Sequence, residues 1–488
     1  MIDSLKGSVK YLVLLVLVYM PIFGHLDTLP IRLWDESRLA LNAYEMQKNG
    51  NLIVTYFDGK PDMWNTKPPL LIWMQAGLME IIGVNELAVR IPSAIAAFLT
   101  CIVIILFSIK YLKEYWFGFI AVLVLITSHG YINTHASRTG DYDALLAFFT
   151  TLSGLSYFAF IETKKNKFLY LFFAALALSI LTKGVTSLLF APGLLIYTLW
   201  QEQLINILKN KHFYIGIVSF LFISLGYYFL REIKNEGYIE AVQMNELGGR
   251  YMNALEGHNA GFWYYYNNFL DFQLTSWYIY IPCGLLVGLS HNSSKMVKLS
   301  VFSTILILTF FLVISSAQTK IQWYDVPLYP YISILIAVFL FSIFNFLSSN
   351  QQILNTLKYN IAPFLFLFLV LIQPYKTIIV KTYFPKEYSW DVDSYRIGYF
   401  LKAAVAGQQD CNNYYLCEEG YNPQNTFYLK ILQKKGIKIS PKDCANLSVG
   451  EKAIAHQKNI KDFIDSHYNT EIIGQFDNVV KYKINGRK

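Results

Sequence analysis

The chain has 488 residues, of which 54% are hydrophobic and only 15% are charged, and its mean hydropathy is +0.35. Soluble domains usually carry about 25% charged residues, so these values exclude a soluble enzyme of this size. The formal net charge is +8 at pH 7. Much of the basic excess lies in short loops between apolar runs, where it orients a membrane protein, so the charge does not indicate nucleic-acid binding.

Apolar, nearly uncharged runs recur along the first 380 residues. A helix of about 20 such residues crosses a hydrocarbon layer of roughly 30 Å. The sequence therefore predicts a polytopic α-helical membrane protein with about eleven transmembrane helices. The expected spans are Tyr11–Leu26, Ala88–Ile109, Trp116–Ser128, Ala144–Ile161, Phe168–Leu181, Val185–Trp200, Phe213–Leu230, Phe269–Leu289, Leu299–Ser315, Val326–Phe346 and Ile361–Val380.

The loops between these spans predict the orientation of the chain. If the N-terminus is cytoplasmic, every inner segment is short and net basic, as the positive-inside rule requires. An odd number of spans then places the C-terminal region outside the cytoplasm. The first apolar run offers no small-x-small cleavage site in Met20–Gly24, so we expect it to be a retained span rather than a signal peptide. The expected location is the cytoplasmic (inner) membrane.

Two domains are expected. Residues 1–380 form a transmembrane catalytic domain, with interfacial helices in two long outer segments at about 27–87 and 231–268, where functional residues should lie. Residues 381–488 hold 28 of the 74 charged residues, which predicts a soluble extracytoplasmic domain. Its short apolar runs alternate with helical patterns, so a small α/β fold is expected. An oxidising compartment allows one disulfide among Cys411, Cys417 and Cys444, and the sequence leaves the pairing open.

The first outer segment contains an adjacent acidic pair, Asp35 and Glu36, where the first span leaves the membrane. A carboxylate at such a mouth can act as a general base on an alcohol or an amine. Helix capping by Asp35, with Glu36 favouring the helix dipole, is the alternative. Asp143, at the start of the fourth span, has the same two interpretations. Further along, Asp58-Gly59 predicts a hairpin turn, and Pro68–Gly83 is expected to be a second interfacial helix.

Several motifs resemble, in order over about 300 residues, the aminoarabinose transferases and protein mannosyltransferases. These are GT-C-fold glycosyltransferases that use a polyprenyl-phosphate sugar. The motifs are Trp34–Arg38, Asn65–Leu71, Glu86–Ser93, Ser137–Asp143, Leu181–Gly184, Asn245–Tyr251, Gly257-His258 before Phe262–Tyr265, and Lys320 before Trp323-Tyr324 and Pro327. The C-terminal domain matches no pattern of this kind.

The resemblance implies a reaction and a set of site residues. It implies that Asp35 is the acidic residue essential for transfer and that Asp143 is a second acidic residue of the site. Glu36, next to Asp35, is a further catalytic candidate from its position alone, with orienting Arg38 or capping the helix as its alternatives. The resemblance also implies that two cations, Lys67 and Arg250, hold the carrier phosphate. Lys320 is a third candidate for this role because of the residues that follow it. A single displacement with Asp35 as base would invert the anomeric centre.

His258 could bind a substrate or a metal, with packing as the alternative. Many relatives have Glu directly before the Lys-Pro-Pro sequence, whereas this chain has Thr66. A divalent metal held by that position together with His258 is therefore not expected, and no cofactor is expected to be required.

The expected partners are the polyprenyl-phosphate sugar, membrane lipids and an extracytoplasmic acceptor, which could be a lipid such as lipid A, a glycan or a protein. The alternative function is a polytopic lipid or sugar transporter or flippase. Coupled transporters generally need ionisable groups within their spans and often show repeated halves. Here the acidic residues cluster in the outer segments instead.

Overall fold

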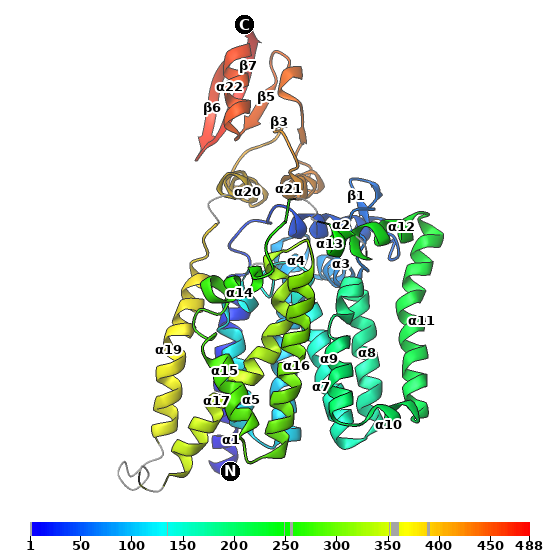
Figure 1. The fold of residues 1–488 in the computed structure, drawn as a ribbon. Helices are drawn as coiled ribbons and strands as arrows, with labels where there is room; N and C mark the ends of the chain where they lie inside the picture. The colour runs from blue at the N-terminus through cyan, green and yellow to red at the C-terminus, as the bar shows by residue number, and fades with distance from the viewer. Residues whose placement is uncertain are drawn as a thin grey trace.

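The computed structural model describes residues 2–133, 135–247, 249–253, 257–350, 352, 361–387 and 391–488, and for residues 2–6, 247, 249 and 250 it describes the backbone alone. A helical bundle carries the N-terminus at its lower end, and a smaller domain with a β-sheet stands above its upper end (Figure 1). The predicted fold class, a polytopic helical protein with a C-terminal α/β domain, is confirmed.

Within the described part of the chain, seven helices are long and apolar enough to cross a membrane, as expected of a multi-pass membrane protein. They are Glu86–Leu112, Asp143–Thr163, Asn166–Leu188, Lys211–Lys234, Ser294–Ser316, Gln322–Ser349 and Ala362–Tyr383. The other four expected spans fall on shorter apolar helical stretches, Gly7–Phe23, Tyr115–Ile126, Ala191–Trp200 and Tyr280–Leu289. The stretch Ala191–Trp200 is shorter than expected because a 3-10 helix (Gly184–Leu188) precedes it and Pro192 lies in its first turn, where the α-helix begins.

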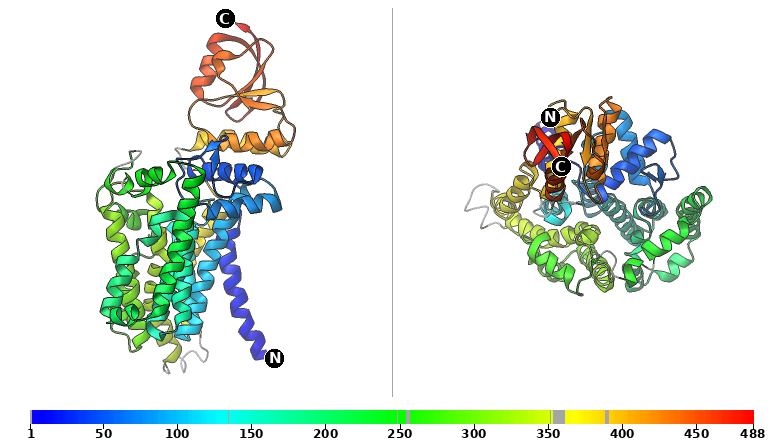
Figure 2. Two further views of the ribbon diagram at one scale, coloured as in Figure 1. Left: turned by 90° about the vertical axis from the view of Figure 1, so that its right-hand side faces the viewer. Right: turned by 90° about the horizontal axis from the view of Figure 1, so that it is seen from above.

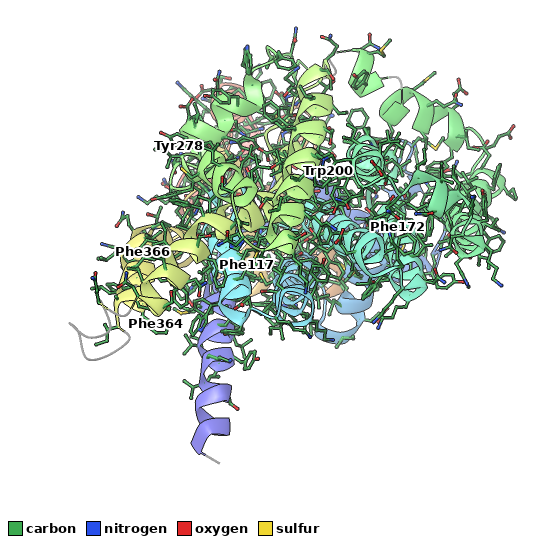
Figure 3. The ribbon with its side chains drawn as sticks, turned by 60° about the horizontal axis from the view of Figure 1, so that its bottom comes forward. Phe117, Phe172, Trp200, Tyr278, Phe364 and Phe366 are labelled. Atoms are coloured by element: carbon green, nitrogen blue, oxygen red, sulfur yellow. The ribbon has the colours of Figure 1, made fainter. Side chains whose placement is uncertain are left out.

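The helices of the bundle have the following bounds: α1 Ile2–Phe23, α4 Glu86–Phe107, α5 Tyr115–Ile126, α7 Asp143–Thr163, α8 Asn166–Lys183, α9 Ala191–Trp200, α10 Leu204–Leu208, α11 Lys211–Lys234, α15 Tyr280–Leu289, α16 Ser294–Ser316, α17 Tyr329–Ser349 and α19 Ala362–Tyr383. Aromatic side chains occur both inside the bundle and on its surface (Figure 3). Phe117 and Phe172 are buried between helices, whereas Trp200, Tyr278 and Phe364 are exposed. An apolar exposed surface is what a lipid-facing bundle requires.

Short helices cover the upper end of the bundle (Figure 1). They are α2 Asp35–Asn49, α3 Leu70–Ile82, α6 His129–Ile132, α12 Tyr238–Val242, α13 Gly249–Met252 and α14 Tyr264–Asn268. α2 ends at Gly50, which has a φ of 69° and so makes a left-handed cap, and the predicted hairpin is formed by β1 (Tyr56–Phe57) and β2 (Lys60–Pro61). Asp58 and Gly59 both have positive φ, as a tight two-residue hairpin turn needs.

The C-terminal domain contains a five-stranded mixed sheet. Its elements are α20 Val392–Val405, β3 Tyr414–Cys417, α21 Pro423–Lys434, β4 Ile439–Pro441, β5 Lys452–Ala455, α22 Lys458–His467, β6 Tyr468–Phe476 and β7 Val479–Arg487. The strand order is β4-β3-β5-β7-β6, with β3 parallel to both of its neighbours and β7 antiparallel to β5 and β6. All five cysteines of the chain are free thiols here.

α20 and α21 lie between the sheet and the bundle, on the side that holds α1 to α4 (Figure 2). Their buried side chains, including Phe400 and Phe427, share one apolar core with Leu39 and Leu41 of α2. Tyr428 of α21 anchors this contact, because its hydroxyl donates to Glu86 at 2.7 Å and accepts the N–H of Ile31 at 2.9 Å. The C-terminal domain is therefore packed tightly onto the first outer segment.

Candidate active site

Asp35 is the first residue of α2, at the upper end of the bundle. The N-cap position is taken by Trp34, which has a φ of 70° and makes no side-chain cap hydrogen bond. The Asp35 side chain is 52% exposed, which leaves its carboxylate accessible to a substrate. A negative charge in this position is also favoured by the helix dipole.

His135 lies beside Asp35, in the loop before α7. Its Nδ1 atom is 2.5 Å from Oδ2 of Asp141 and 3.7 Å from Oδ2 of Asp35. The ring stacks on the indole of Trp323, with centroids 3.4 Å apart, which fixes its plane. Burial alone would raise the pKa of Asp141, but the hydrogen bond and charge of His135 lower it, so Asp141 is a stable acceptor for the imidazole.

The sequence analysis did not assign His135 a role. Only its place two residues before the Ser137–Asp143 motif could have drawn attention to it. The three donor atoms of Asp35, His135 and Asp141 lie within 4.8 Å of one another. Two carboxylates and an imidazole are ligands that suit a divalent cation.

Asp143 starts α7 and is buried behind this group. Its Oδ1 atom accepts a hydrogen bond from Nζ of Lys183 at 2.5 Å, and the ammonium group lies 5.3 Å from the ring of Tyr324. Asp143 and Lys183 come from different helices, α7 and α8, and both are buried. The structure thus joins Asp143, an expected site residue, with Lys183 of the Leu181–Gly184 motif as an ion pair.

Glu36 points away from Asp35 into the protein. Its carboxylate makes a two-pronged ion pair with Arg90 of α4, at 2.7 and 2.9 Å, and accepts the backbone N–H groups of Arg32 and Gly140. Burial raises the pKa of Glu36, yet Arg90 and the backbone donors outweigh it and lower the pKa overall. The same guanidinium donates to the carbonyl oxygens of Leu26, Leu29 and Pro30. Arg90 thus ties α2 to the end of the first span.

Asp62, which the sequence analysis also missed, organises the hairpin next to α2. It accepts two hydrogen bonds from Arg38, at 2.6 and 2.9 Å, and one from Asn42 at 3.0 Å. Burial raises the pKa of Asp62, but its bonds to Arg38 lower it below the ordinary value. Asn65 then links this network to the hydroxyl of Tyr142 at 2.9 Å. The first outer segment is therefore rigidly attached to the loop that carries Asp141.

Lys67 follows this network at the entrance to α3. Its ammonium group is 3.5 Å from Oε1 of Glu246 and 5.7 Å from the centre of the Tyr142 ring. The hydroxyl of Thr66 donates to the same oxygen of Glu246 at 3.2 Å. A carboxylate from a distant segment thus lies beside the position where many relatives have Glu. The sequence analysis did not single out Glu246.

The other expected site residues lie further along the chain. The side chain of Arg250 is outside the described residues, although its backbone belongs to α13. His258 is exposed, and its carbonyl oxygen accepts the N–H of Lys320 at 3.0 Å. The Lys320 ammonium donates to the carbonyl oxygen of Ala317, and burial lowers the pKa of Lys320. Among the described residues, no side-chain contact joins His258 to Thr66.

Comparisons with known proteins agree with this architecture. The family described as dolichyl-phosphate-mannose-protein mannosyltransferase matches residues 66–228. An uncharacterised protein of Aquifex aeolicus (strain VF5) is 26% identical over 380 residues, which cover 77% of this chain and 70% of that protein. The undecaprenyl phosphate-alpha-4-amino-4-deoxy-L-arabinose arabinosyl transferase of Wigglesworthia glossinidia brevipalpis is 25% identical over 407 residues, or 79% of this chain and 68% of the relative.

Among solved structures, ArnT from Cupriavidus metallidurans bound to undecaprenyl phosphate superposes with a TM-score of 0.71 and 13% identity, covering 98% of this chain and 97% of that one. This similarity shows that the two chains share a fold. The resemblance to the aminoarabinose transferases and protein mannosyltransferases is therefore confirmed, and with it the predicted enzyme class, a GT-C-type glycosyltransferase.

Proposed function

We propose that this enzyme transfers a sugar from a polyprenyl-phosphate carrier to an extracytoplasmic acceptor, with inversion at the anomeric carbon. The observation that carries the proposal is the accessible carboxylate of Asp35 beside the His135–Asp141 pair. The relatives named above include an undecaprenyl-phosphate-dependent transferase and a structure that binds undecaprenyl phosphate, which supports the class of donor. A transporter is not favoured by these relatives.

In this mechanism Asp35 accepts the proton of the acceptor hydroxyl or amine as that group attacks the sugar. His135, held by Asp141 and by the ring of Trp323, lies beside Asp35 and fixes the local geometry. Glu36 positions Asp35 through its ion pair with Arg90 rather than reacting itself. Asp143, paired with Lys183, stabilises the start of α7 beneath the site and remains a second acidic residue of it.

Fixed cations must receive the negative charge that develops on the departing carrier phosphate. Lys67 is the described residue best placed for this role, because its ammonium lies in the outer segment close to Tyr142. We keep Arg250 and Lys320 as further candidates.

No metal is required in the proposed mechanism. The position before Lys67 is a threonine whose hydroxyl is bound to Glu246, and His258 is exposed. The Asp35–His135–Asp141 group could hold a divalent cation, which would supply Lewis-acid stabilisation. Yet the 2.5 Å contact between His135 and Asp141 has the geometry of a hydrogen bond.

The first test of function is the purified enzyme with a panel of polyprenyl-phosphate sugars and an envelope lipid extract. We expect the mass of one acceptor to rise by one sugar residue, and the same mass to disappear from the envelope of cells that lack the gene. Mass spectrometry identifies donor and acceptor together. Transfer should continue in the presence of a chelator, and loss of transfer that a divalent metal restores would contradict the metal-free mechanism.

Lys67→Ala is expected to weaken carrier binding by tenfold or more. The substitution removes a charge-assisted contact worth about 1.5–3 kcal/mol. The measurement is the affinity of the purified protein for the polyprenyl-phosphate carrier. Lys60→Ala, in the exposed strand β2 of the same outer segment, is the matched control and should leave the affinity unchanged. Equal affinities for both variants would remove Lys67 from the phosphate site.

The proposed orientation places the active site and the C-terminal domain outside the cytoplasm of an inner-membrane protein. We expect a cysteine at exposed position Val449 in the C-terminal domain to react with an impermeant thiol reagent. A cysteine at Lys165, between α7 and α8, should be protected in the same cells. Both tags are introduced into a chain whose five cysteines have been replaced. The reverse labelling pattern would overturn the orientation.

A further inference from the structure

A cavity of about 380 Å³ lies at the upper ends of α1 and α19. It is lined by the ends of these two helices, by Arg90 near the start of α4, and by residues 129, 132, 133, 138 and 139. Neither Asp35 nor Lys67 lines it. The cavity is therefore separate from the proposed site of the carrier phosphate.

The lining of the cavity is strongly basic. It contains five cationic side chains and one carboxylate, Glu387, which accepts a hydrogen bond from Tyr399 at 2.6 Å. Two of the cations are paired, since Arg90 binds Glu36 and Arg32 lies 3.0 Å from Asp391. The other three, Arg138, Lys381 and Lys386, make no ion pair with any described carboxylate.

The unpaired cations have different environments. Arg138 is half-buried, and its guanidinium donates to the carbonyl oxygens of Pro21 and Gly24 at 2.9 and 2.7 Å, at the end of α1. Carbonyl dipoles balance only part of its charge. Lys381 and Lys386 are exposed at the end of α19 and just after it. A mobile anion could contact these two ammonium groups without disturbing any described ion pair.

His129 adds a buried polar atom to the same lining. Its Nδ1 atom is buried without a hydrogen-bond partner among the described residues. Burial, with a contribution from the charge of Lys381, lowers the pKa of His129 to about 4. The neutral ring can therefore serve as a hydrogen-bond donor or acceptor toward a ligand in the cavity.

The surface below the cavity is apolar. α1 exposes Leu12 and Tyr19, and α19 exposes Phe368 and Leu369. The two helices pack against each other, with the hydroxyl of Tyr375 donating to the carbonyl oxygen of Leu17 at 3.0 Å. At the rim of the cavity, Phe384 is 73% exposed. A basic pocket directly above a lipid-facing surface matches the chemistry of an amphiphile with an anionic headgroup.

We propose that this cavity binds the phosphate-bearing headgroup of a second membrane amphiphile, whose chains lie along α1 and α19. The headgroup contacts Arg138, Lys381 and Lys386. Its binding is independent of the carrier phosphate at Lys67 and does not depend on the proposed transfer reaction. Residues 133 and 138 line the cavity, whereas His135, in the same loop, contacts Asp35. The bound amphiphile would therefore contact the loop that carries His135.

Native mass spectrometry of the full chain in zwitterionic nanodiscs tests the proposal. Three probes are titrated: phosphatidylglycerol, a phosphorylated glycolipid and soluble glycerol phosphate. We expect both lipids, or one of them, to bind in preference to phosphatidylcholine, and glycerol phosphate to bind far more weakly. The difference between the two lipids identifies the source of the headgroup. Binding of glycerol phosphate as tight as that of the lipids would contradict an amphiphile.

The Lys381→Gln/Lys386→Gln variant should lose roughly 10- to 30-fold in affinity for the bound lipid, because each cation near a membrane contributes about a factor of five. Lys376→Gln on the exposed side of α19 is the matched control, and it should bind like the unsubstituted protein. Lys67→Gln should weaken carrier binding alone. Equal lipid affinities for the double variant and the Lys376→Gln control, with both proteins folded, would overturn the site.

Discussion

Asp35→Asn should reduce sugar transfer by about 10² or more while carrier-lipid affinity stays unchanged. The asparagine keeps the shape of the side chain but cannot accept a proton, so only the step that needs a base is lost. Because the Asp35 carboxylate is half exposed and, among the described residues, makes no ion pair shorter than its 3.7 Å contact with His135, the substitution should leave no buried charge unpaired. Folding should therefore be preserved.

The measurements are single-turnover transfer, carrier affinity and thermal unfolding of the same purified proteins. Asp58→Asn is the matched control, since it removes an exposed carboxylate from the same outer segment, and Asn tolerates the φ of 51° at that position. Its activity should equal that of the unsubstituted enzyme. A folded Asp35→Asn protein with nearly full activity would exclude Asp35 as the base.

The parts of the fold that follow local rules were predictable. Long apolar runs became helices, and the Asp58-Gly59 turn made the expected hairpin, because its two positive φ angles are a property of those residues. Gly50 ended α2 for the same reason. In the C-terminal domain, β5 gives only a weak strand signal, since the run Ala453–Ala455 is short and poor in β-branched residues.

The contacts that build the site were much harder to predict, because they join residues far apart in the chain. Lys183 is 40 residues from Asp143, and Tyr428 is 342 residues from Glu86. No periodicity or spacing brings such pairs together. His135 shows the same limit, because a single histidine gains meaning only when the fold places it beside Asp35 and Asp141.

The packing of the C-terminal domain also has a consequence for its role. α20 and α21 share a core with α2. In the loop before α21, the hydroxyl of Tyr421 accepts a hydrogen bond from Arg38 at 3.1 Å, and its ring lies 5.2 Å from the ring of Trp34. Removal of the domain would expose this core to water. Its role is therefore better tested by point substitutions at its surface than by truncation.

Removal of one partner of the buried ion pair between Glu36 and Arg90 should destabilise the protein strongly. Arg90→Met leaves the Glu36 carboxylate buried without its partner, and breaking such a pair costs about 3–5 kcal/mol. The Arg90→Met/Glu36→Gln variant removes both charges and should recover part of this loss. The control is Lys442→Met, which breaks the surface pair with Glu451 at 2.7 Å and should cost about 0–1 kcal/mol.

The pH dependence of unfolding gives a second readout for the same pair. Because the pKa of Glu36 is lowered in the folded protein, its stabilising effect is fully present above the ordinary pKa of 4.5 and is lost as the pH falls through the folded-state value. In Arg90→Met, burial is no longer offset by the guanidinium, so the carboxyl should take up its proton at higher pH. Thermal unfolding of the purified proteins between about pH 2 and pH 8 measures both effects. If Arg90→Met unfolds like the Lys442→Met control at every pH but loses transfer, Glu36 takes part in the chemistry instead of positioning Asp35.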